Sequence, residues 1–164
     1  MLTVRPATIQ DAEQLLLWRN ETAARRWSRS QAEVSLAEHS RWLCEVLDSG
    51  RHLVLVAEAD GQPVGSVRFA EQYADTWVVS MVLDPALRGR GLGRPCLTAA
   101  ERMLLSGTVG TVGTVCARGG VTIEAVIHRD NPRSLQLFRA CGYEPIPEAA
   151  AEDFLTYAKV VVQP

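Results

Sequence analysis

Glycines occupy every second position of one short, arginine-rich segment of the chain. The segment consists of Arg88, Gly89, Arg90, Gly91, Leu92 and Gly93, and Arg94 follows it. Because glycine has no Cβ, successive backbone N–H groups can turn toward one anion, and a helix that starts behind them adds partial positive charge. The arginines can add charge-assisted hydrogen bonds to phosphate oxygens. The segment therefore predicts a pyrophosphate site, and the alternative is an ordinary loop between a strand and a helix.

The elements around this segment are read from hydrophobic periodicity and from capping residues. Strand patterns occur at residues 2–6, 52–58, 63–69, 76–84, 121–128 and 154–162. Helix patterns occur at 12–20, 36–48, 91 or 92 to about 105, and 132–139, with a broken segment through Trp27. We expect residues 71–75 and the Gly-Thr-Val-rich segment 107–120 to be loops. The order predicts a mixed α/β sheet with helices on both faces, in which the glycine segment joins the nearly all-apolar strand 76–84 to a helix.

Length and composition limit what the chain can be. It has 164 residues, 47% of them hydrophobic, so we expect one domain over residues 1–164. A net charge of −2 provides no global field for nucleic acid or for an anionic membrane. Neither a signal peptide nor an apolar run of spanning length is evident, which favours a cytoplasmic protein.

The cysteines predict free thiols and no metal site. Cys44, Cys96, Cys116 and Cys141 are widely spaced, and no Cys or His cluster has metal-ligand spacing. Free thiols are the usual state in a reducing cytoplasm. None of the four has the sequence context of an activated nucleophile, although Cys96 lies close to a helix start.

Two motifs together give the chain a family resemblance. The segment RGRGLG at 88–93 matches an R/Q-x-x-G-x-G/A loop, and NPRSLQLFRACGY at 131–143 matches N-x-x-[AS]-x-x-[LF]-[YF]-x-x-x-G-[FY]. In this order and on these elements, they resemble the GNAT superfamily of acetyl-CoA-dependent N-acetyltransferases. The resemblance covers nearly the whole chain and implies a mostly antiparallel sheet of six to seven strands that splays between its fourth and fifth strands.

The resemblance implies a cofactor site and a reaction. In relatives, the backbone of the fourth strand pairs with the pantetheine arm of acetyl-CoA, a role that falls here on Met81, Val82 and Leu83. The glycine segment would hold the pyrophosphate, and Asn131, Ser134 and Phe138 would lie along the cofactor. The implied reaction is direct attack of an amine on the thioester, with a backbone N–H stabilising the oxyanion. Asn131 is also a natural helix N-cap, and the two roles are compatible.

One residue departs from the family pattern. Many relatives have a tyrosine at the position of Phe138, and its hydroxyl protonates the departing CoA thiolate. Phe138 cannot do this. Water, Cys141 or Tyr143 could supply the proton instead, and a thiolate is a good enough leaving group for activity to survive.

An attacking ammonium must also lose a proton, which requires a base. Glu124 and His128 are four residues apart in one predicted strand and therefore point to the same face. His39, in the helix 36–48, is the third candidate, and Glu38 is beside it. Each of these side chains could instead have an ordinary structural role at the surface or in a paired cluster.

The N-terminal half is the acceptor side in this superfamily. The residues Arg19, Asn20, Trp27, His39 and Trp42 resemble the pattern of acetyltransferases that act on nucleotide-linked 4-amino-sugars in pseudaminic-acid-type pathways. Aromatic and imidazole faces suit a nucleobase or a sugar, and Arg19 suits a diphosphate. Trp42 could equally belong to a helix core.

The predicted partner is therefore a small-molecule amine, with acetyl-CoA as co-substrate, no metal and no nucleic acid. A homodimer is possible for such an enzyme. The alternatives are an enzyme that acetylates protein N-termini or amino acids, and a degenerate acyl-CoA-binding regulatory module, which the phenylalanine at 138 favours.

Overall fold

The computed structural model describes residues 1–73, 75–107, 120–149 and 151–162, so most of the expected loop at 107–120 lies outside the described residues. The strands are β1 (Leu2–Pro6), β2 (His52–Ala59), β3 (Gln62–Tyr73), β4 (Thr76–Leu83), β5 (Val121–His128), β6 (Glu144–Pro145) and β7 (Phe154–Val161). The helices are α1 (Ala12–Asn20), α2 (Thr22–Arg26), α3 (Leu36–Asp48), α4 (Gly93–Ser106) and α5 (Pro132–Ala140). Short 3-10 turns occupy Ile9–Asp11, Pro85–Leu87 and Pro147–Ala149.

The described strands form one sheet with the order β1-β2-β3-β4-β5-β7-β6. All neighbouring pairs in it are antiparallel except β4 and β5, which are parallel. The expected hairpin between β2 and β3 is present, and its turn residues Asp60 and Gly61 have φ of 50° and 78°. The apolar strand β4 is central, as predicted from its composition.

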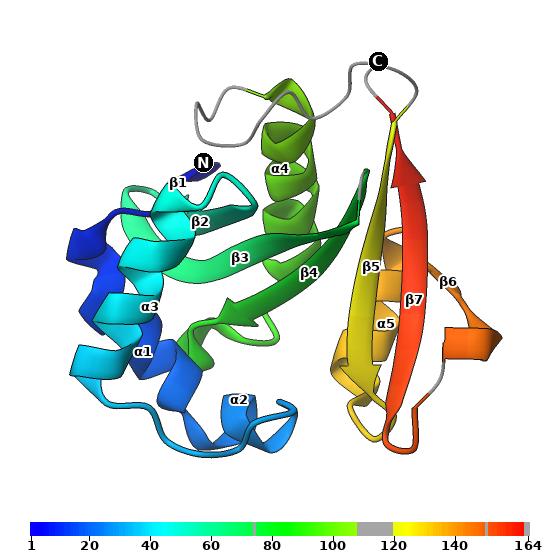
Figure 1. Cartoon of the computed structure of the whole chain (residues 1–164), viewed down its shortest axis with the longest axis horizontal. Helices are drawn as coiled ribbons and strands as arrows, with labels where there is room; N and C mark the ends of the chain where they lie inside the picture. The colour runs from blue at the N-terminus through cyan, green and yellow to red at the C-terminus, as the bar shows by residue number, and fades with distance from the viewer. Residues whose placement is uncertain (74, 108–119, 150, 163–164) are drawn as a thin grey trace.

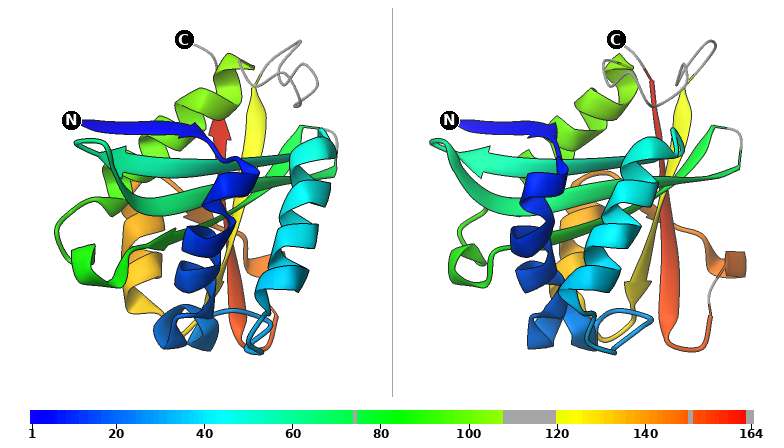
Figure 2. Two further views of the ribbon diagram at one scale, coloured as in Figure 1. Left: turned by 90° about the vertical axis from the view of Figure 1, so that its left-hand side faces the viewer. Right: turned by 60° about the vertical axis from the view of Figure 1, so that its left-hand side comes forward.

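Helices cover both faces of the sheet, as expected (Figures 1 and 2). In the left view of Figure 2, α1 and α3 lie in front of the strands, and α4 and α5 lie behind them. Alternate residues of each strand therefore enter different cores. Ile123 and Tyr157 pack on the side of α4 and α5, whereas Val54 and Val56 pack under α1 and α3.

The helix boundaries follow the capping residues. The Ser35 backbone N–H donates to Glu38 Oε2 at 3.0 Å, and the Glu38 N–H donates to Ser35 Oγ at 3.3 Å, which forms the capping box expected for α3. At the other end of the chain, Gly142 follows α5 with φ of 85°. A left-handed conformation of this kind is typical of helix ends.

Three elements differ from the sequence-based prediction. The broken segment after Asn20 contains a short helix, α2, whose first N–H groups are capped by Glu21. Residues 71–73, expected in a loop, continue β3, because Glu71 and Tyr73 pair with β4. The two-residue strand β6, which pairs with β7, was not predicted because it is too short to show a pattern.

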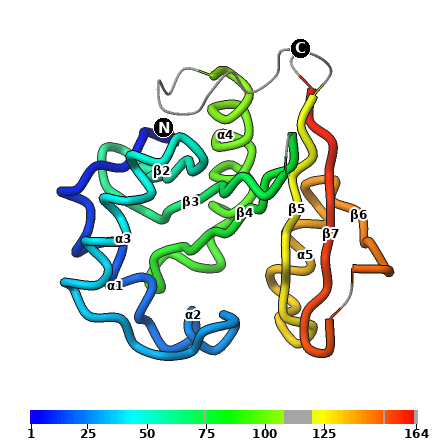
Figure 3. Tube along the Cα trace, viewed as in Figure 1, coloured from blue at the N-terminus to red at the C-terminus, as the bar shows by residue number. Residues whose placement is uncertain are grey.

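The sheet divides between β4 and β5 (Figure 3). The two strands pair only from Thr76 to Val79, opposite Thr122 to Ala125. Beyond this pair they diverge toward their carboxyl ends, while β4 stays paired with β3 as far as Leu83. The expected splay at the fourth and fifth strands is therefore present.

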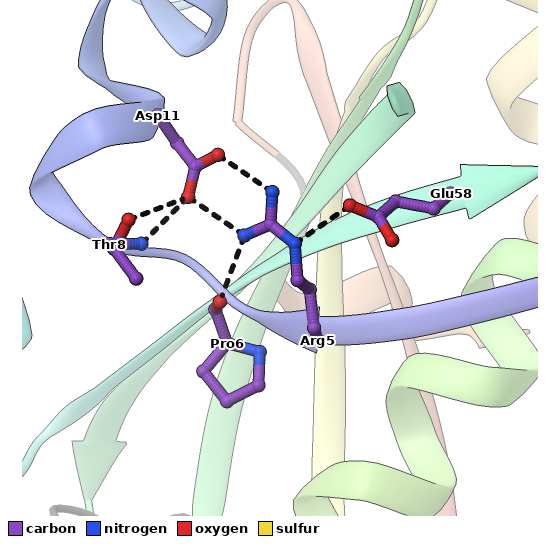
Figure 4. A network of polar contacts seen from close by, with 5 residues as sticks. All are labelled: Arg5, Pro6, Thr8, Asp11 and Glu58. Atoms are coloured by element: carbon purple, nitrogen blue, oxygen red, sulfur yellow. Dashed lines mark hydrogen bonds and ion pairs between the residues drawn. The ribbon is translucent and has the colours of Figure 1, made fainter. Parts of the chain in front are cut away.

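A polar network fixes the start of α1 to the first two strands (Figure 4). The Arg5 guanidinium donates to both carboxylate oxygens of Asp11, at 2.9 and 2.8 Å, and to Glu58 Oε1 at 2.7 Å. Asp11 also accepts from the Thr8 N–H at 2.7 Å. The network joins β1, β2 and the 3-10 turn before α1.

Candidate functional site

The loop at residues 88–94 presents backbone N–H groups that the described part of the chain leaves unbonded. Among the described residues, none of these N–H groups donates a well-formed hydrogen bond, whereas the flanking N–H groups of Leu87 and Cys96 donate to Asp84 and Leu92. The loop ends at the N-terminus of α4, where the first N–H groups of a helix have no partner in the helix. A run of free donors at a helix start is the arrangement that binds phosphate.

Glycine is required at this loop for two reasons. Gly89 and Gly91 both have φ of 78°, a conformation that residues with a Cβ rarely adopt. At Gly93 a Cβ would lie 3.1 Å from a methyl carbon of Leu137, so the missing side chain lets α4 approach α5 closely. The alternating glycines therefore set both the turn of the loop and its place against α5.

The three arginines of the loop do not have the same role. The Arg88 side chain donates to the Leu83 carbonyl at 3.2 Å and forms an ion pair with Glu21 at 2.8 Å. Its charge is thus used inside the protein, where it joins the loop to α2. Arg90 and Arg94 are exposed and form no ion pair with the described residues, so they are the two arginines available to a phosphate.

The open edge of β4 presents backbone groups from alternate residues. The Asp84 N–H donates to the Val64 carbonyl at 2.9 Å, so by the two-residue alternation of a strand the Val82 N–H also faces β3. The polar groups of Met81 and Leu83 therefore face the side from which β5 has diverged. Of the three residues predicted to pair with the pantetheine arm, Met81 and Leu83 thus present backbone groups at the opening, whereas the backbone of Val82 is hydrogen-bonded to β3.

The second motif begins the helix that borders the opening. Asn131 is the N-cap of α5, and its Oδ1 accepts from the Ser134 N–H at 3.2 Å. The Asn131 side-chain amide donates no hydrogen bond to the described residues, so it can serve a ligand as well as the helix. Phe138 is buried, and its ring meets the edge of Tyr143 with centroids 5.0 Å apart.

The two side chains that could replace a tyrosine acid differ in availability. Tyr143 donates its hydroxyl hydrogen to Glu101 Oε1 at 2.8 Å, inside the core under α4. Burial, followed by the Glu101 charge, raises the pKa of Tyr143. Burial raises the pKa of the Cys141 thiol too, but Cys141 is only partly buried. Both effects leave these groups protonated at neutral pH.

Glu124 is placed where the sheet divides. It pairs with Val78, one residue before the last pair between β4 and β5. It is partly exposed, and it points to the face of α1–α3, because its neighbours Ile123 and Ala125 enter the other core. The Glu124 carboxylate has no hydrogen bond or ion pair within the described part of the chain, so it is free to accept a proton.

His128 shares the face of Glu124, as the spacing predicted, but its ring is already engaged. Its Nδ1 accepts from the Asp130 N–H at 3.1 Å, which places the hydrogen of a neutral ring on Nε2. The ring lies between Trp27 and Phe154, with centroids 5.2 Å from each. The Nδ1 atom of His128 is therefore engaged by the protein, and a role of His128 in catalysis stays a prediction.

The predicted acceptor residues of α1 and α3 form a compact group. The His39 ring, 6% exposed, lies 5.2 Å from Trp42, and His39 Nε2 is buried without a partner among the described residues. Burial, and then the charge of Arg19, lowers the pKa of His39. Arg19 donates to the Ser30 carbonyl through Nη2, while its Nη1 is buried and finds no partner in the described part of the chain.

Two other predicted acceptor residues have local structural roles. The Asn20 amide exchanges two hydrogen bonds with the Val34 backbone, at 2.7 and 3.0 Å, and so connects the end of α1 to the segment before α3. Trp27 contacts His128 on β5 and lies under the Arg26 guanidinium, 4.6 Å away. The segment after α2 therefore reaches across to the end of β5.

Two functional candidates escaped the sequence reasoning. Arg68 lies 5.4 Å above the Trp42 ring and projects from β3 onto the α1–α3 face. The signal for it was present, because the strand PVGSVRF alternates and places Ser66 and Arg68 on one face. Glu21, which caps α2 and pairs with Arg88, had no recognisable signal, since its partner is 67 residues away.

The sequence matches one family of known proteins. A family model described as an acetyltransferase (GNAT) domain matches residues 1–144. No curated protein matches the sequence.

Solved structures match nearly the whole chain at low identity. A spermidine N-acetyltransferase from Vibrio cholerae, in complex with CoA and spermine, is 15% identical, with a TM-score of 0.81 over 97% of this chain and 95% of that one. A domain from Methanocaldococcus jannaschii is 20% identical, with a TM-score of 0.78 over 98% and 99%. A phosphinothricin acetyltransferase from Sinorhizobium meliloti, in complex with acetyl-CoA, is 19% identical, with a TM-score of 0.76 over 98% and 88%.

Proposed function

This chain belongs to the GNAT acetyltransferase family, and from that premise we propose that it transfers the acetyl group of acetyl-CoA to the amine of a small molecule. The observation that carries the proposal is the juxtaposition of two sets of unused backbone groups. One set is the N–H groups of residues 88–94, and the other, at the edge of β4, is the N–H groups of Met81 and Leu83; neither set has a well-formed hydrogen bond with the described residues, whereas the Leu83 carbonyl accepts from Arg88. A diphosphate and an extended, amide-containing arm need these two surfaces in this order.

The proposed chemistry is direct transfer. The amine nitrogen attacks the thioester carbonyl carbon, and a β4 N–H, from Met81 or Leu83, stabilises the resulting oxyanion. The C–S bond then breaks, the CoA thiolate leaves, and the amine proton passes to a base. We assign Glu124 as that base, directly or through one water, because its carboxylate is free and lies where the strands diverge. Water protonates the thiolate, with Cys141 as the alternative donor.

The acceptor is proposed at the level of chemical class. The V. cholerae structure contains spermine, the S. meliloti protein is named for phosphinothricin, and a related structure of an aminoglycoside acetyltransferase contains kanamycin, so amine acceptors are common on this fold. A nucleotide-linked amino-sugar remains our specific proposal, supported by Arg19, Trp42 and His39. Amino acids and protein N-termini are the alternatives.

A binding module without turnover is the second candidate. It is favoured by Phe138, which is buried and carries no acidic proton, and by Tyr143, whose hydroxyl is bonded to Glu101. Such a protein would bind acetyl-CoA as tightly as the enzyme would, and release no thiol.

The test is thiol release from acetyl-CoA with a panel of amines, run beside equilibrium binding of acetyl-CoA. We expect release that depends on one class of amine, and a loss of about a hundredfold in kcat for Glu124→Gln with little change in acetyl-CoA affinity. Glu45→Gln is the matched control, because Glu45 is exposed on α3. Binding without release from any amine would support the second candidate and contradict the first.

A further inference from the structure

We propose that the acceptor carries an oxyanion, a carboxylate or a phosphate, which binds between Arg19 and Arg68 on the face of the sheet under α1 and α3. This rests on the proposed function and adds to it the charge of the substrate. The two arginines come from different elements, α1 and β3, and both lie beside the aromatic pair His39 and Trp42.

Arg68 is a cation with no carboxylate partner in the described ranges of the chain. It projects from β3 opposite the exposed Ser80 of β4, and its guanidinium lies over the Trp42 ring. It donates no hydrogen bond and forms no ion pair with the described residues. Burial, and then the charge of Arg19, lowers the pKa of Arg68.

Arg19 and His39 each have a buried nitrogen atom with no hydrogen-bond partner among the described residues. Within the described ranges, Arg19 Nη1 and His39 Nε2 are both buried without a hydrogen-bond partner. Buried polar atoms are nearly always paired in folded proteins, so two such atoms in one cluster indicate a missing partner. A guanidinium forms its strongest hydrogen bonds with carboxylate or phosphate oxygens, and a bidentate geometry strengthens the pair.

No carboxylate of the described residues neutralises this cluster. Glu21, on the neighbouring helix, is paired with Arg88. On the same face of the sheet, Asp84 accepts from Trp18 Nε1 at 3.1 Å and Glu58 is paired with Arg5. Glu124 is also on this face, two strands from Arg68, and the register places its Cα roughly 12 Å from that of Arg68, from ~4.8 Å between strands and ~3.3 Å per residue. A small ligand can bridge that distance, with its amine at Glu124 and its anion at the arginines.

The arrangement selects against polycations. Two guanidinium groups that form no ion pair with the described residues, placed beside the amine site, repel a substrate with several positive charges, and a like-charge contact is an effective means of rejection. We therefore expect polyamines and aminoglycosides, which structures of the same fold are named for, to be poor acceptors for this chain.

The kinetic test uses matched pairs of amines. One pair is an amino acid and its amide, another is glucosamine 6-phosphate and glucosamine, and a UDP-linked 4-amino-sugar with its free sugar is the third. We expect kcat/KM to be at least about tenfold higher for the anionic member of the preferred pair, and spermidine and kanamycin to be poor acceptors. Which of the three pairs the protein prefers then shows whether the anionic group of the acceptor is a carboxylate or a phosphate.

Two variants assign the preference to the cluster. Arg68→Gln should lower kcat/KM for the anionic member by about 10- to 100-fold, as expected for a charged hydrogen bond, and should leave the neutral member within about twofold. Arg68→Lys should recover part of the loss. Arg102→Gln, on an exposed position of α4 at the other face, is the charge-matched control and should change neither.

A binding measurement keeps the inference independent of turnover. In protein saturated with CoA, whose phosphates then occupy the loop at 88–94, inorganic phosphate is titrated while the indole N–H resonance of Trp42 is followed by NMR. We expect a saturable shift that is lost in Arg68→Gln and kept in Arg102→Gln. No shift of Trp42, or acetylation of spermidine in preference to every anionic amine, would overturn the inference; in the second case the proposed acetyl transfer would still stand.

Discussion

Cys96 is the residue that most directly separates the two possible routes of acetyl transfer. It lies in the first turn of α4, beside the loop at residues 88–94, where a reactive thiolate could be stabilised. The structure instead places its side chain in the core, fully buried, and burial raises the pKa of the thiol to about 11. At neutral pH it is a protonated, apolar side chain.

We therefore expect Cys96→Ala to keep kcat within about threefold of the parent, at a cost in stability of roughly 1 kcal/mol for the small cavity. The measurement is steady-state thiol release well below the melting temperature, with Cys44→Ala, an exposed thiol, as the control. A loss of activity approaching completeness in a folded Cys96→Ala protein would point to a covalent acetyl-enzyme.

Single residues also show where sequence reasoning reaches its limit. The conformation of the loop at 88–94 was predictable, because alternating glycines before a helix indicate a turn with positive φ, while its role as a phosphate site stays a prediction. The contacts of Asn20 and Arg68 were not predictable, since they depend on partners elsewhere in the chain: Asn20 is bonded to Val34, and Arg68 packs on Trp42. The strand alternation gave only the face of the sheet from which Arg68 projects. A polar residue in a pattern does not reveal whether its partner is the protein or a ligand.

At the scale of elements, the short helix α2 connects the loop at residues 88–94 to the proposed acceptor side. Glu21 caps the N–H groups of α2 at 3.1 and 3.0 Å and also pairs with Arg88 at the start of the loop. The segment after α2 continues to Trp27, which contacts His128 at the end of β5. The short helix that the sequence left undefined therefore connects both sides of the opening between β4 and β5.

The junction of β1, β2 and α1 gives a prediction on pH. The hydrogen bonds from Arg5 hold the pKa of Asp11 below its usual value. A carboxyl group whose pKa is lower in the folded state stabilises the fold above the pKa of the unfolded chain, about 4, and loses that contribution as the pH falls through the folded value. Asp11→Asn should thus lower the free energy of unfolding by roughly 1 kcal/mol at pH 7, a figure that allows for solvent screening of Arg5.

Urea unfolding at a series of pH values checks this. The difference between parent and Asp11→Asn should be constant from about pH 8 to 5 and shrink progressively below about pH 4. Asp60→Asn is the control, because Asp60 pairs with the N-terminal ammonium at a fully exposed position and should show a smaller effect. Equal stability of parent and Asp11→Asn at pH 7 would mean that the network in Figure 4 does not stabilise this junction.

At the scale of the whole molecule, the order of elements was largely predictable because its signals are local. The alternation of β2 and β3 about Asp60-Gly61, the capping box at Ser35 and the N-cap at Asn131 each lie within a few residues. The parallel pairing of β4 with β5 and its end at Val79 are long-range features. The family resemblance implied that the two strands splay, but their parallel direction and the residue at which the pairing ends were not predicted, since no local pattern states which strands meet or where they part.

In the candidate site, too, local features were predictable from the sequence and long-range features were not. The loop at 88–93 could be proposed as a phosphate site from its own residues and stays a prediction, while the different directions of the Met81 and Val82 backbone groups, and the hydrogen bond from Asp130 to His128, needed the strand register and the turn. No helix among the described residues is long and apolar enough to cross a membrane.

The free N–H groups of residues 88–94 are central to this account, in which they bind the pyrophosphate of acetyl-CoA, and calorimetric titration of CoA into Gly91→Val tests that role most directly. Gly61 has the same φ of 78° and, like Gly91, has open space where a Cβ would lie, so Gly61→Val imposes equal backbone strain at the β2–β3 turn. We predict that Gly91→Val weakens CoA binding more than about tenfold, because the strained loop loses its aligned donors, while Gly61→Val leaves the Kd unchanged. Equal CoA affinity of Gly91→Val and the parent protein would contradict the account.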